Sequence, residues 1–427
     1  MDVRTSCSGR PSIIYVSLQM KKLALIAIAL CCSLGASAAG FLKVQGHDIV
    51  TPAGERFYIQ GTNLGNWLNP EGYMFGFRST NAPHTINEAF CQLAGPEATA
   101  RFWRQFKDNY ITRADIDYIA STGANTVRLP FHYKLFTDED YMGLTSAQDG
   151  FARVDSLVDW CRGAGLHLIL DMHDAPGGQT GDNIDDSYGY PWLMTDAVSQ
   201  QLFCDIWRRI AERYRDEEVI LGYELINEPV ATYFKEEEEA LNSSLVEVLR
   251  KGLAAIRSVD SNHIVLIGAP QWNSNFTPLE GVDFGDDNIV YTCHRYGGDA
   301  TAGAIASYIN FRDASGKPMY MGEIGHNTDA WQADFVKVMK DNNIGYTFWP
   351  YKKCGDSCMM GFALPEGWDE IVRFTEAPRG SYADVRKAWP DRSVVERVMV
   401  QILENCKFAN CTPQTGYIAS LGFNNEQ

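Results

Sequence analysis

The stretch ILGYELINEP, residues 220–229, decides the fold. Residues 220–226 form an apolar run with the length of a buried strand, and Asn227 and Glu228 follow it directly. A second stretch, MYMGEIG at residues 319–325, repeats this arrangement, with Glu323 after its apolar start. Strands buried on both faces have such continuous apolar runs, and they occur in parallel sheets covered by helices. The two stretches therefore predict two parallel strands that each end in a glutamate.

Runs of this kind recur along the chain and alternate with segments of helical periodicity. The predicted strands are residues 57–61, 126–129, 166–171, 220–226, 263–268, 289–293, 319–322 and 346–349. The pattern predicts an α/β fold, a single-domain (β/α)8 TIM barrel, preceded by a short N-terminal β-hairpin. A doubly wound open sheet would need a glycine-rich nucleotide loop after the first strand, and GTNLGNW at residues 61–67 lacks that spacing.

The first 38 residues have the layout of a secretory signal peptide: Lys21 and Lys22, an apolar stretch over 23–34, and a small-residue cleavage site at 36–38. Residues 1–19 are interpreted as a wrongly assigned start, and an N-terminal anchor is the alternative. We expect a barrel domain over residues 39–390, with a C-terminal helix and tail, residues 391–427, packed on it. The leader predicts export from a bacterium, to the periplasm or beyond.

The net charge of the chain limits the classes of partner that it can bind. Removal of the predicted leader, with four basic residues and one acidic residue, takes the formal charge from −17 to −20. Such a surface repels nucleic-acid phosphates and anionic lipid, so we expect no nucleic acid, no stable membrane insertion, and a monomer. Of the eleven cysteines, eight follow the leader; 354/358 and 406/411 are close in sequence, and disulfides or buried thiols both remain open.

Polar side chains stand at nearly every predicted strand end, where barrel enzymes have their active sites. They are Arg128, Asp171, His173, Asn227, Glu228, His294, Tyr296 and Glu323, with Trp349 ending the last strand. Arg128 could instead serve a structural ion pair, and either histidine could belong to the core. Asp171 and His173 flank Met172, but no third ligand recurs at metal-site spacing. The sequence therefore predicts neither a metal nor another cofactor.

Two glutamates at one end of a barrel suit the hydrolysis of a glycosidic bond, which requires two carboxyl groups. We expect Glu323 to attack the anomeric carbon and Glu228 to act as acid and then base, with carboxyl groups roughly 5–5.5 Å apart. Arg128 and Tyr296 would favour the Glu323 anion, and His294 would tune Glu228. Asn227 would bind a sugar hydroxyl above the floor formed by Trp349. Candidate sugar platforms in loops are Trp67, Tyr73, Trp192 and Trp272.

The chain resembles glycoside hydrolase family 5, also called cellulase family A, from about residue 61 to 349. The positions usual in that family are matched in order by Arg128, His173, Asn227, Glu228, His294, Tyr296, Glu323 and Trp349. GTNLGNWLNPEGYMF and DMHDAPGGQTGDN resemble its exo-β-1,3-glucanase branch, which implies that Glu71 contacts the terminal sugar. Two departures are Arg295, where that branch commonly has a second histidine, and the loop after Trp349.

The resemblance implies a retaining enzyme for β-linked glucan oligo- or polysaccharides. It also leaves other sugars open: a mannanase or a furanose-releasing exo-enzyme with the same mechanism. A non-catalytic sugar-binding barrel is a further alternative, although it would normally have lost one glutamate. A metal-dependent barrel hydrolase is the last alternative. Loss of activity with a chelator would distinguish it from the other enzymes.

Overall fold

The computed structural model describes residues 40–423. The predicted signal peptide therefore lies outside the described residues. Among the helices of residues 40–423, none combines the length and the apolar character that crossing a membrane requires.

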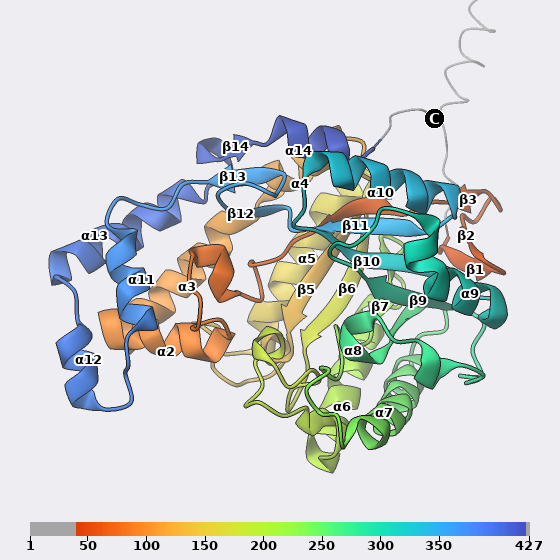
Figure 1. Ribbon diagram of the computed structural model, residues 1–427, viewed down its shortest axis with the longest axis horizontal. Helices are drawn as coiled ribbons and strands as arrows, with labels where there is room; N and C mark the ends of the chain where they lie inside the picture. The colour runs from red at the N-terminus through yellow and green to blue at the C-terminus, as the bar shows by residue number, and fades with distance from the viewer. Residues whose placement is uncertain (1–39, 424–427) are drawn as a thin grey trace, which may run out of the picture.

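Eight parallel strands close into a barrel, so the predicted TIM barrel is confirmed (Figure 1). In chain order they are β4 (Gln60–Asn63), β5 (Thr126–His132), β6 (His167–Asp174), β7 (Ile220–Glu224), β8 (Ile264–Gly268), β9 (Ile289–His294), β10 (Met319–Gly325) and β11 (Gly345–Trp349). Each predicted strand has a counterpart. The first predicted strand, 57–61, begins too early, because Phe57 belongs to β3 (Arg56–Phe57), a strand of a separate sheet.

That separate sheet is the predicted N-terminal hairpin with a third strand added. The strands β1 (Lys43–Gln45), β2 (Asp48–Val50) and β3 pair antiparallel in this order. Leu42 and Ile49 join an apolar cluster with inward residues of the barrel, among them Ile169 and Leu266. The sheet thus closes the amino-terminal end of the barrel and leaves the other end for chemistry.

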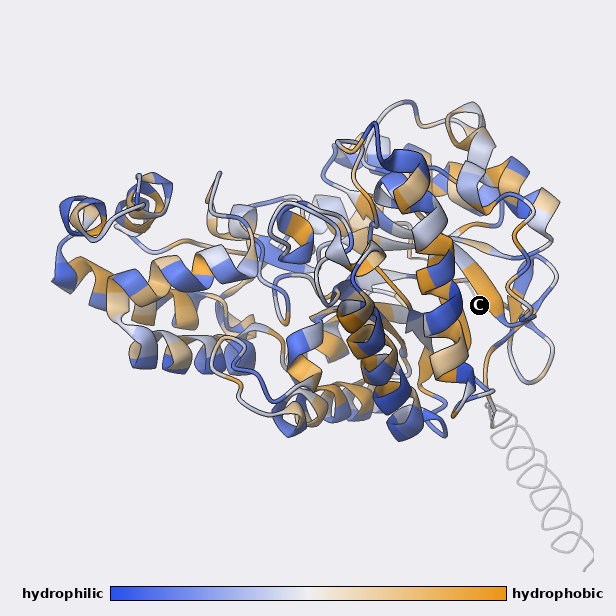
Figure 2. Cartoon of the chain, turned by 90° about the horizontal axis from the view of Figure 1, so that it is seen from below, coloured by the Kyte–Doolittle hydropathy of each residue, from blue (hydrophilic) through white to orange (hydrophobic). Residues whose placement is uncertain are grey.

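The barrel is surrounded by helices with one apolar face, which Figure 2 shows as two-sided colouring. They are α4 (Arg113–Ser121), α5 (Ala147–Ala164), α6 (Ala197–Tyr214), α7 (Glu238–Arg257), α9 (Ala306–Ser315) and α10 (Asp329–Asp341). Local signals set their ends: the backbone N–H of Thr112 donates to Asp115 at 2.8 Å before α4. Gly165, with φ 72°, ends α5.

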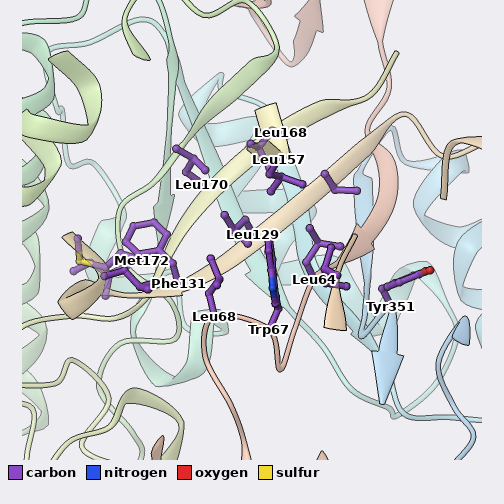
Figure 3. Packing of buried hydrophobic residues seen from close by; sticks show 14 of the residues in the cluster. Leu64, Trp67, Leu68, Leu129, Phe131, Leu157, Leu168, Leu170, Met172 and Tyr351 are labelled. Atoms are coloured by element: carbon purple, nitrogen blue, oxygen red, sulfur yellow. The ribbon is translucent and has the colours of Figure 1, made fainter. Parts of the chain in front are cut away.

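Strand alternation separates an outer core from the inner site. On β5 and β6, Leu129, Phe131, Leu168, Leu170 and Met172 face outward and pack with Trp67 and Leu157 (Figure 3). The residues between them, Arg128, Ile169, Asp171 and His173, point to the barrel axis, because successive side chains of a strand lie on opposite faces. Ile169 belongs to the inner apolar cluster and is paired with Arg128 in register, and Asp171 and His173 follow it toward the carboxyl end of β6.

A helical lobe flanks the barrel on the left of Figure 1. Its helices are α2 (Pro83–Ala94) and α3 (Pro96–Tyr110), inserted after β4, and α11 (Trp368–Glu376), α12 (Tyr382–Ala388) and α13 (Arg392–Asn405), which follow β11. Phe90 stacks on Trp103 within the insertion, and Phe77 stacks on Trp368, which joins the two parts of the chain. A small sheet, β12 (Lys352–Cys354), β13 (Met360–Phe362) and β14 (Thr412–Pro413), leads to α14 (Thr415–Ser420), which packs on α10.

Candidate active site

Arg128 lies fully buried at the centre of the carboxyl-terminal end of the barrel. Its guanidinium forms a fork-like pair with Glu224, Nε to Oε2 at 2.8 Å and Nη2 to Oε1 at 2.9 Å. Nη1 donates to Glu323 Oε1 at 2.7 Å, and Nη2 lies 3.0 Å from Asp171 Oδ2. A buried charge is tolerated only when it is paired in this way. Arg128 therefore serves a structural ion pair and contacts Glu323 as well.

Glu323 receives a donor on each carboxylate oxygen. Arg128 Nη1 contacts Oε1, and the Tyr296 hydroxyl donates to Oε2 at 2.6 Å. Hydrogen bonds to the charged form of a carboxyl group favour that form. A register shift in β10 between Met321 and Glu323 places this side chain among the inward groups. The geometry holds Glu323 as an anion next to an open pocket.

Glu228 has the opposite environment. Burial raises the pKa of Glu228 to about 8, against the lowering effect of Arg128. Its backbone has φ 43°, a left-handed conformation that is uncommon outside glycine. His294 Nδ1 lies 2.8 Å from Glu228 Oε1, and burial lowers the pKa of His294 to about 4, so the ring is neutral at pH 7. The raised pKa of Glu228 favours its protonated form at that pH.

The two glutamates lie close together, with a carboxylate oxygen of Glu228 and one of Glu323 within 4.8 Å of each other. Carboxyl groups of retaining glycosidases are about 5–5.5 Å apart, and those of inverting enzymes roughly 6.5–9.5 Å apart. An oxygen–oxygen distance within 4.8 Å fits the shorter separation, in which the second carboxylate attacks the anomeric carbon directly instead of activating a water. The pair can attack an anomeric carbon and protonate its leaving oxygen.

His173, Asn227 and Trp349 form a connected group beside the glutamates. His173 Nδ1 lies 2.8 Å from Asp171 Oδ2, and its Nε2 lies 3.3 Å from Asn227 Nδ2. Asn227 Oδ1 accepts from Arg128 Nη2 at 2.8 Å. The rings of His173 and Trp349 stack, with centroids 5.3 Å apart and an interplanar angle of 5°. Burial lowers the pKa of His173 to about 3, so it stays neutral.

A pocket of ≈ 400 Å³ opens over these groups. Its lining is Glu71, Tyr73, His173, Ile184, Glu228, Tyr296, Glu323, His326 and Trp349. Burial, then the charges of Glu323 and Glu228, raise the pKa of Glu71 well above its usual range, and its Oε1 has no hydrogen-bond partner. The Trp349 indole N–H donates to the Tyr73 hydroxyl at 2.6 Å. The residues predicted as a site from the sequence thus meet in one place, with Arg128, Asn227 and His294 beneath the pocket.

Comparison with known proteins places this geometry in a family. The model of the cellulase family, glycosyl hydrolase family 5, matches residues 84–355, which is more than half of the chain. The chain belongs to glycosyl hydrolase family 5. The predictions of fold, family and glycosidase class are therefore confirmed.

Relatives within family 5 carry different names. A beta-xylosidase of Phanerodontia chrysosporium is 27% identical over 75% of this chain and 72% of its own length. Endoglucanase C of Acetivibrio thermocellus is 35% identical over 46% of this chain and 53% of its own. A probable glucan 1,3-beta-glucosidase A of Aspergillus clavatus is 29% identical over 49% and 50%. The chain thus spans about half the length of the latter two relatives.

Solved structures share the barrel at low sequence identity. A rutinosidase from Aspergillus niger superposes with a TM-score of 0.57 at 20% identity, over 70% of this chain and 91% of its own. A beta-glucanase from Saccharophagus degradans gives 0.52 at 17% identity, over 86% and 94%. These likenesses concern the fold.

Several residues of this family-5 site were not predicted from the sequence. Glu224 pairs with Arg128 but lies inside the apolar run 220–226, where the alternation of β7 was the available signal. His326, which contacts the Tyr73 hydroxyl at 3.2 Å, follows the quoted MYMGEIG directly. Asn63 Oδ1 accepts from Arg128 Nη1 at 3.0 Å, and Asn273 contacts His294. Amides carry no charge pattern by which they could be recognised.

The prediction of Trp67 as a sugar platform is wrong. Trp67 is 1% exposed, and its indole N–H donates to the backbone carbonyl of Lys107 at 2.7 Å. It lies after β4 in the outer core of the barrel and is not among the residues that line the pocket. Tyr73 lines the pocket, and Trp192 is half exposed at 49%. The eight cysteines among residues 40–423 are free thiols.

Proposed function

We propose that this family-5 protein is a retaining β-glycosidase acting on glucan-type oligo- or polysaccharides by double displacement. The observation that carries the proposal is the pairing of Glu323, held as an anion by Arg128 and Tyr296, with the protonated Glu228 less than 4.8 Å away. One acid and one nucleophile in contrasting environments are what the reaction demands.

In the first step Glu323 attacks the anomeric carbon and the glycosidic C–O bond breaks. Glu228 transfers its proton to the departing oxygen, which leaves as an alcohol. In the second step Glu228, now a carboxylate, takes a proton from water, whose oxygen attacks the anomeric carbon and releases Glu323. The proton returned to Glu228 restores the starting state, so the cycle balances without another reagent.

The sugar is proposed to lie on Trp349, whose indole is held by Tyr73 and stacked on His173. Asn227 Nδ2 is proposed to donate to the 2-hydroxyl, where hydrogen bonds strengthen at the oxocarbenium-like transition state. Glu71, with an unpaired Oε1 in the pocket wall, is proposed to bind a hydroxyl of the terminal sugar. Glucans are favoured over other sugars because the relatives include an endoglucanase and a glucan 1,3-beta-glucosidase.

The test is hydrolysis of p-nitrophenyl glycosides and of β-glucan, mannan and xylan oligosaccharides by wild type and Glu323→Gln. We expect turnover of glucan-type substrates that vanishes in the variant while the thermal unfolding midpoint is retained. The product ladder separates endo from exo action. Turnover that persists in Glu323→Gln would refute the assignment of the nucleophile.

A metal-dependent hydrolase is the contrasting mechanism. Among residues 40–423, Glu228, His294 and Glu323 alone form a group of side chains close enough to share an ion. Arg128 and Tyr296 already donate to Glu323, and a cation would compete with the arginine for that carboxylate. We expect unchanged activity after dialysis against EDTA; loss restored by a divalent metal would favour the metal mechanism.

Export is a separate proposal and rests on the predicted leader at residues 1–38. Sequencing of the amino terminus of the protein recovered from the periplasm or medium tests it. A mature terminus near Ala39 would support cleavage at the predicted site, and an intact leader would contradict it.

A further inference from the structure

His294 has different partners on its two ring nitrogens. Nδ1 lies 2.8 Å from Glu228 Oε1, and Nε2 lies 3.2 Å from Asn273 Nδ2. The next closest contacts are Glu323 Oε2, 3.7 Å from Nδ1, and Glu224 Oε1, 4.0 Å from Nε2. An amide nitrogen can only donate, and a neutral imidazole has one donor and one acceptor nitrogen. With the Asn273 amide in this orientation, Nε2 is the acceptor and Nδ1 carries the hydrogen.

The tautomer decides where Glu228 can hold its own proton. A hydrogen on His294 Nδ1 points at Glu228 Oε1, so the carboxyl proton belongs on Oε2. With the hydrogen on Nε2 instead, Nδ1 would accept, and the carboxyl proton would be drawn to Oε1 and toward the ring. Only the first arrangement keeps the acid proton available to a leaving oxygen in the pocket.

The backbone around Asn273 is built in an unfavourable conformation. Gln271, Trp272 and Asn273 have φ of 53°, 56° and 56°, three successive left-handed residues without a glycine. The Gln271 N–H donates to the carbonyl of Val230 at 2.9 Å, and Val230 itself has φ 54°. Such strain persists only where surrounding structure enforces it, and it gathers at functional sites. Here it ties the loop after β8 to the loop that holds Glu228.

The contact with His294 is the one hydrogen bond of the Asn273 side chain within residues 40–423. Asn273 is fully buried, and its Oδ1 has no hydrogen-bond partner. An unsatisfied buried oxygen is costly, so a packing role alone would be served better by an apolar residue. The contact of its Nδ2 with His294 is the interaction that the side chain makes.

We infer that Asn273 is a positioning residue, which fixes the Nδ1–H tautomer of His294 so that Glu228 keeps its transferable proton on Oε2. This inference rests on the proposed acid role of Glu228. Asn273 itself does not touch substrate. Its effect passes through one hydrogen bond to the imidazole and a second one from the imidazole to the acid.

The tautomer can be observed without any turnover. Long-range ¹H–¹⁵N NMR of the intact protein distinguishes protonated from bare ring nitrogens, and His294→Gln identifies the resonances. We expect Nδ1 protonated and Nε2 bare in wild type. In Asn273→Asp the carboxylate can only accept, so Nε2 should become protonated. A wild-type ring with hydrogen on Nε2 would overturn the inference, whether or not any variant folds.

Kinetics test the consequence for the acid. On glycosides with poor leaving groups, we expect Asn273→Asp to lower kcat/KM by about 10- to 100-fold, part of the roughly 10²–10⁴-fold that general acid catalysis supplies. On activated aryl glycosides, which need no acid, the loss should stay within about three-fold. Equal losses on both classes, or a change in KM alone, would contradict a role through Glu228.

Asn275→Asp is the matched control, because it adds the same charge two residues along the same loop. Asn275 Nδ2 donates to Gln271 Oε1 at 2.9 Å, and Gln271 Nε2 donates to Asn242 Oδ1 at 3.1 Å. If both amides flip, Gln271 can donate to the new carboxylate and Asn242 to Gln271. We expect its kcat/KM to stay within about two-fold on both classes.

Neither variant alters an ionisable group that faces His294. These groups are Glu224, Glu228, Glu323, Arg128 and His173. If the wild-type protein hydrolyses none of the glycosides, the proposed function is wrong. The NMR measurement then still decides which tautomer His294 adopts.

Discussion

The guanidinium of Arg128 lies 2.7 Å from the carboxylate of Glu323, although 195 positions separate them in the chain. The same guanidinium holds Glu224 and Asp171, so one cation serves three carboxyl groups in the interior of the barrel. Its planar fork permits these contacts at once, whereas a lysine ammonium is a single point of charge. Stability and catalysis are therefore coupled at this residue.

Replacing Arg128 by lysine should impair both properties. The charge is kept, but the fork to Glu224 and the contact to Glu323 cannot both be made. Because unpaired carboxylates would remain buried, we expect the free energy of unfolding to fall by about 3 kcal/mol or more, and kcat to fall with it. Denaturant unfolding and kcat measured on the same preparation test this. Arg162→Lys is the control: Arg162 is 48% exposed and pairs with Glu217 at the surface, so the change should stay below about 1 kcal/mol.

The pH dependence follows from Glu228. Burial raises its pKa to about 8, with Arg128 opposing, so the acid form is present below that pH and is lost above it. For substrates with poor leaving groups, kcat/KM should fall by roughly tenfold per pH unit above about pH 8. A pH–rate profile measures this. In Glu228→Ala, the residual activity on the same substrates should show no alkaline limb; an unchanged limb would assign it to another group.

Replacement of Glu71 by glutamine should have little effect on kcat/KM. Burial, and then the nearby charge of Glu323, raise the pKa of Glu71 well above its usual range, which favours the neutral carboxyl group, a hydrogen-bond donor and acceptor. Glu71→Gln keeps both functions, so we expect a loss in kcat/KM of less than about five-fold. Glu71→Ala removes them and should cost about 10- to 100-fold. Similar losses in the two variants would show that the charged carboxylate is what binds the sugar.

The Tyr73 hydroxyl should act by holding Trp349. It accepts the indole N–H at 2.6 Å and contacts His326 Nε2 at 3.2 Å. In Tyr73→Phe the buried N–H loses its partner, and we expect KM to rise about three- to ten-fold with a smaller change in kcat. Steady-state kinetics decide this, and Tyr382→Phe, at an 85% exposed position, is the control. A fall in kcat with unchanged KM would point to a direct role of the hydroxyl in the chemistry.

Most of the barrel could be predicted because buried parallel strands leave uninterrupted apolar runs. The run at 57–61 was placed too early, since Phe57 satisfies its hydrogen bonds with β2 and the chain enters the barrel only at Gln60. The helices α2 and α3 were missed. They form an insertion whose apolar faces bury against each other and against α13, a packing partner almost 300 residues away.

The ionisable members of the site were predictable because charge at the end of an apolar run is unusual. Glu224 was missed because it stands within such a run, and its reason for being there is the guanidinium of Arg128 on another strand. Asn273 was missed because a left-handed turn brings it to His294. Neither partner is near in sequence, so only the three-dimensional arrangement reveals the contact.

During turnover Glu323 is expected to form a glycosyl-enzyme. The most direct measurement is trapping with the 2-deoxy-2-fluoro derivative of an aryl glycoside that wild type hydrolyses, followed by peptide mass spectrometry. We expect one added sugar per chain, located on Glu323, and no label in Glu323→Gln. A label on another residue, or direct release of sugar with inverted anomeric configuration, would contradict it.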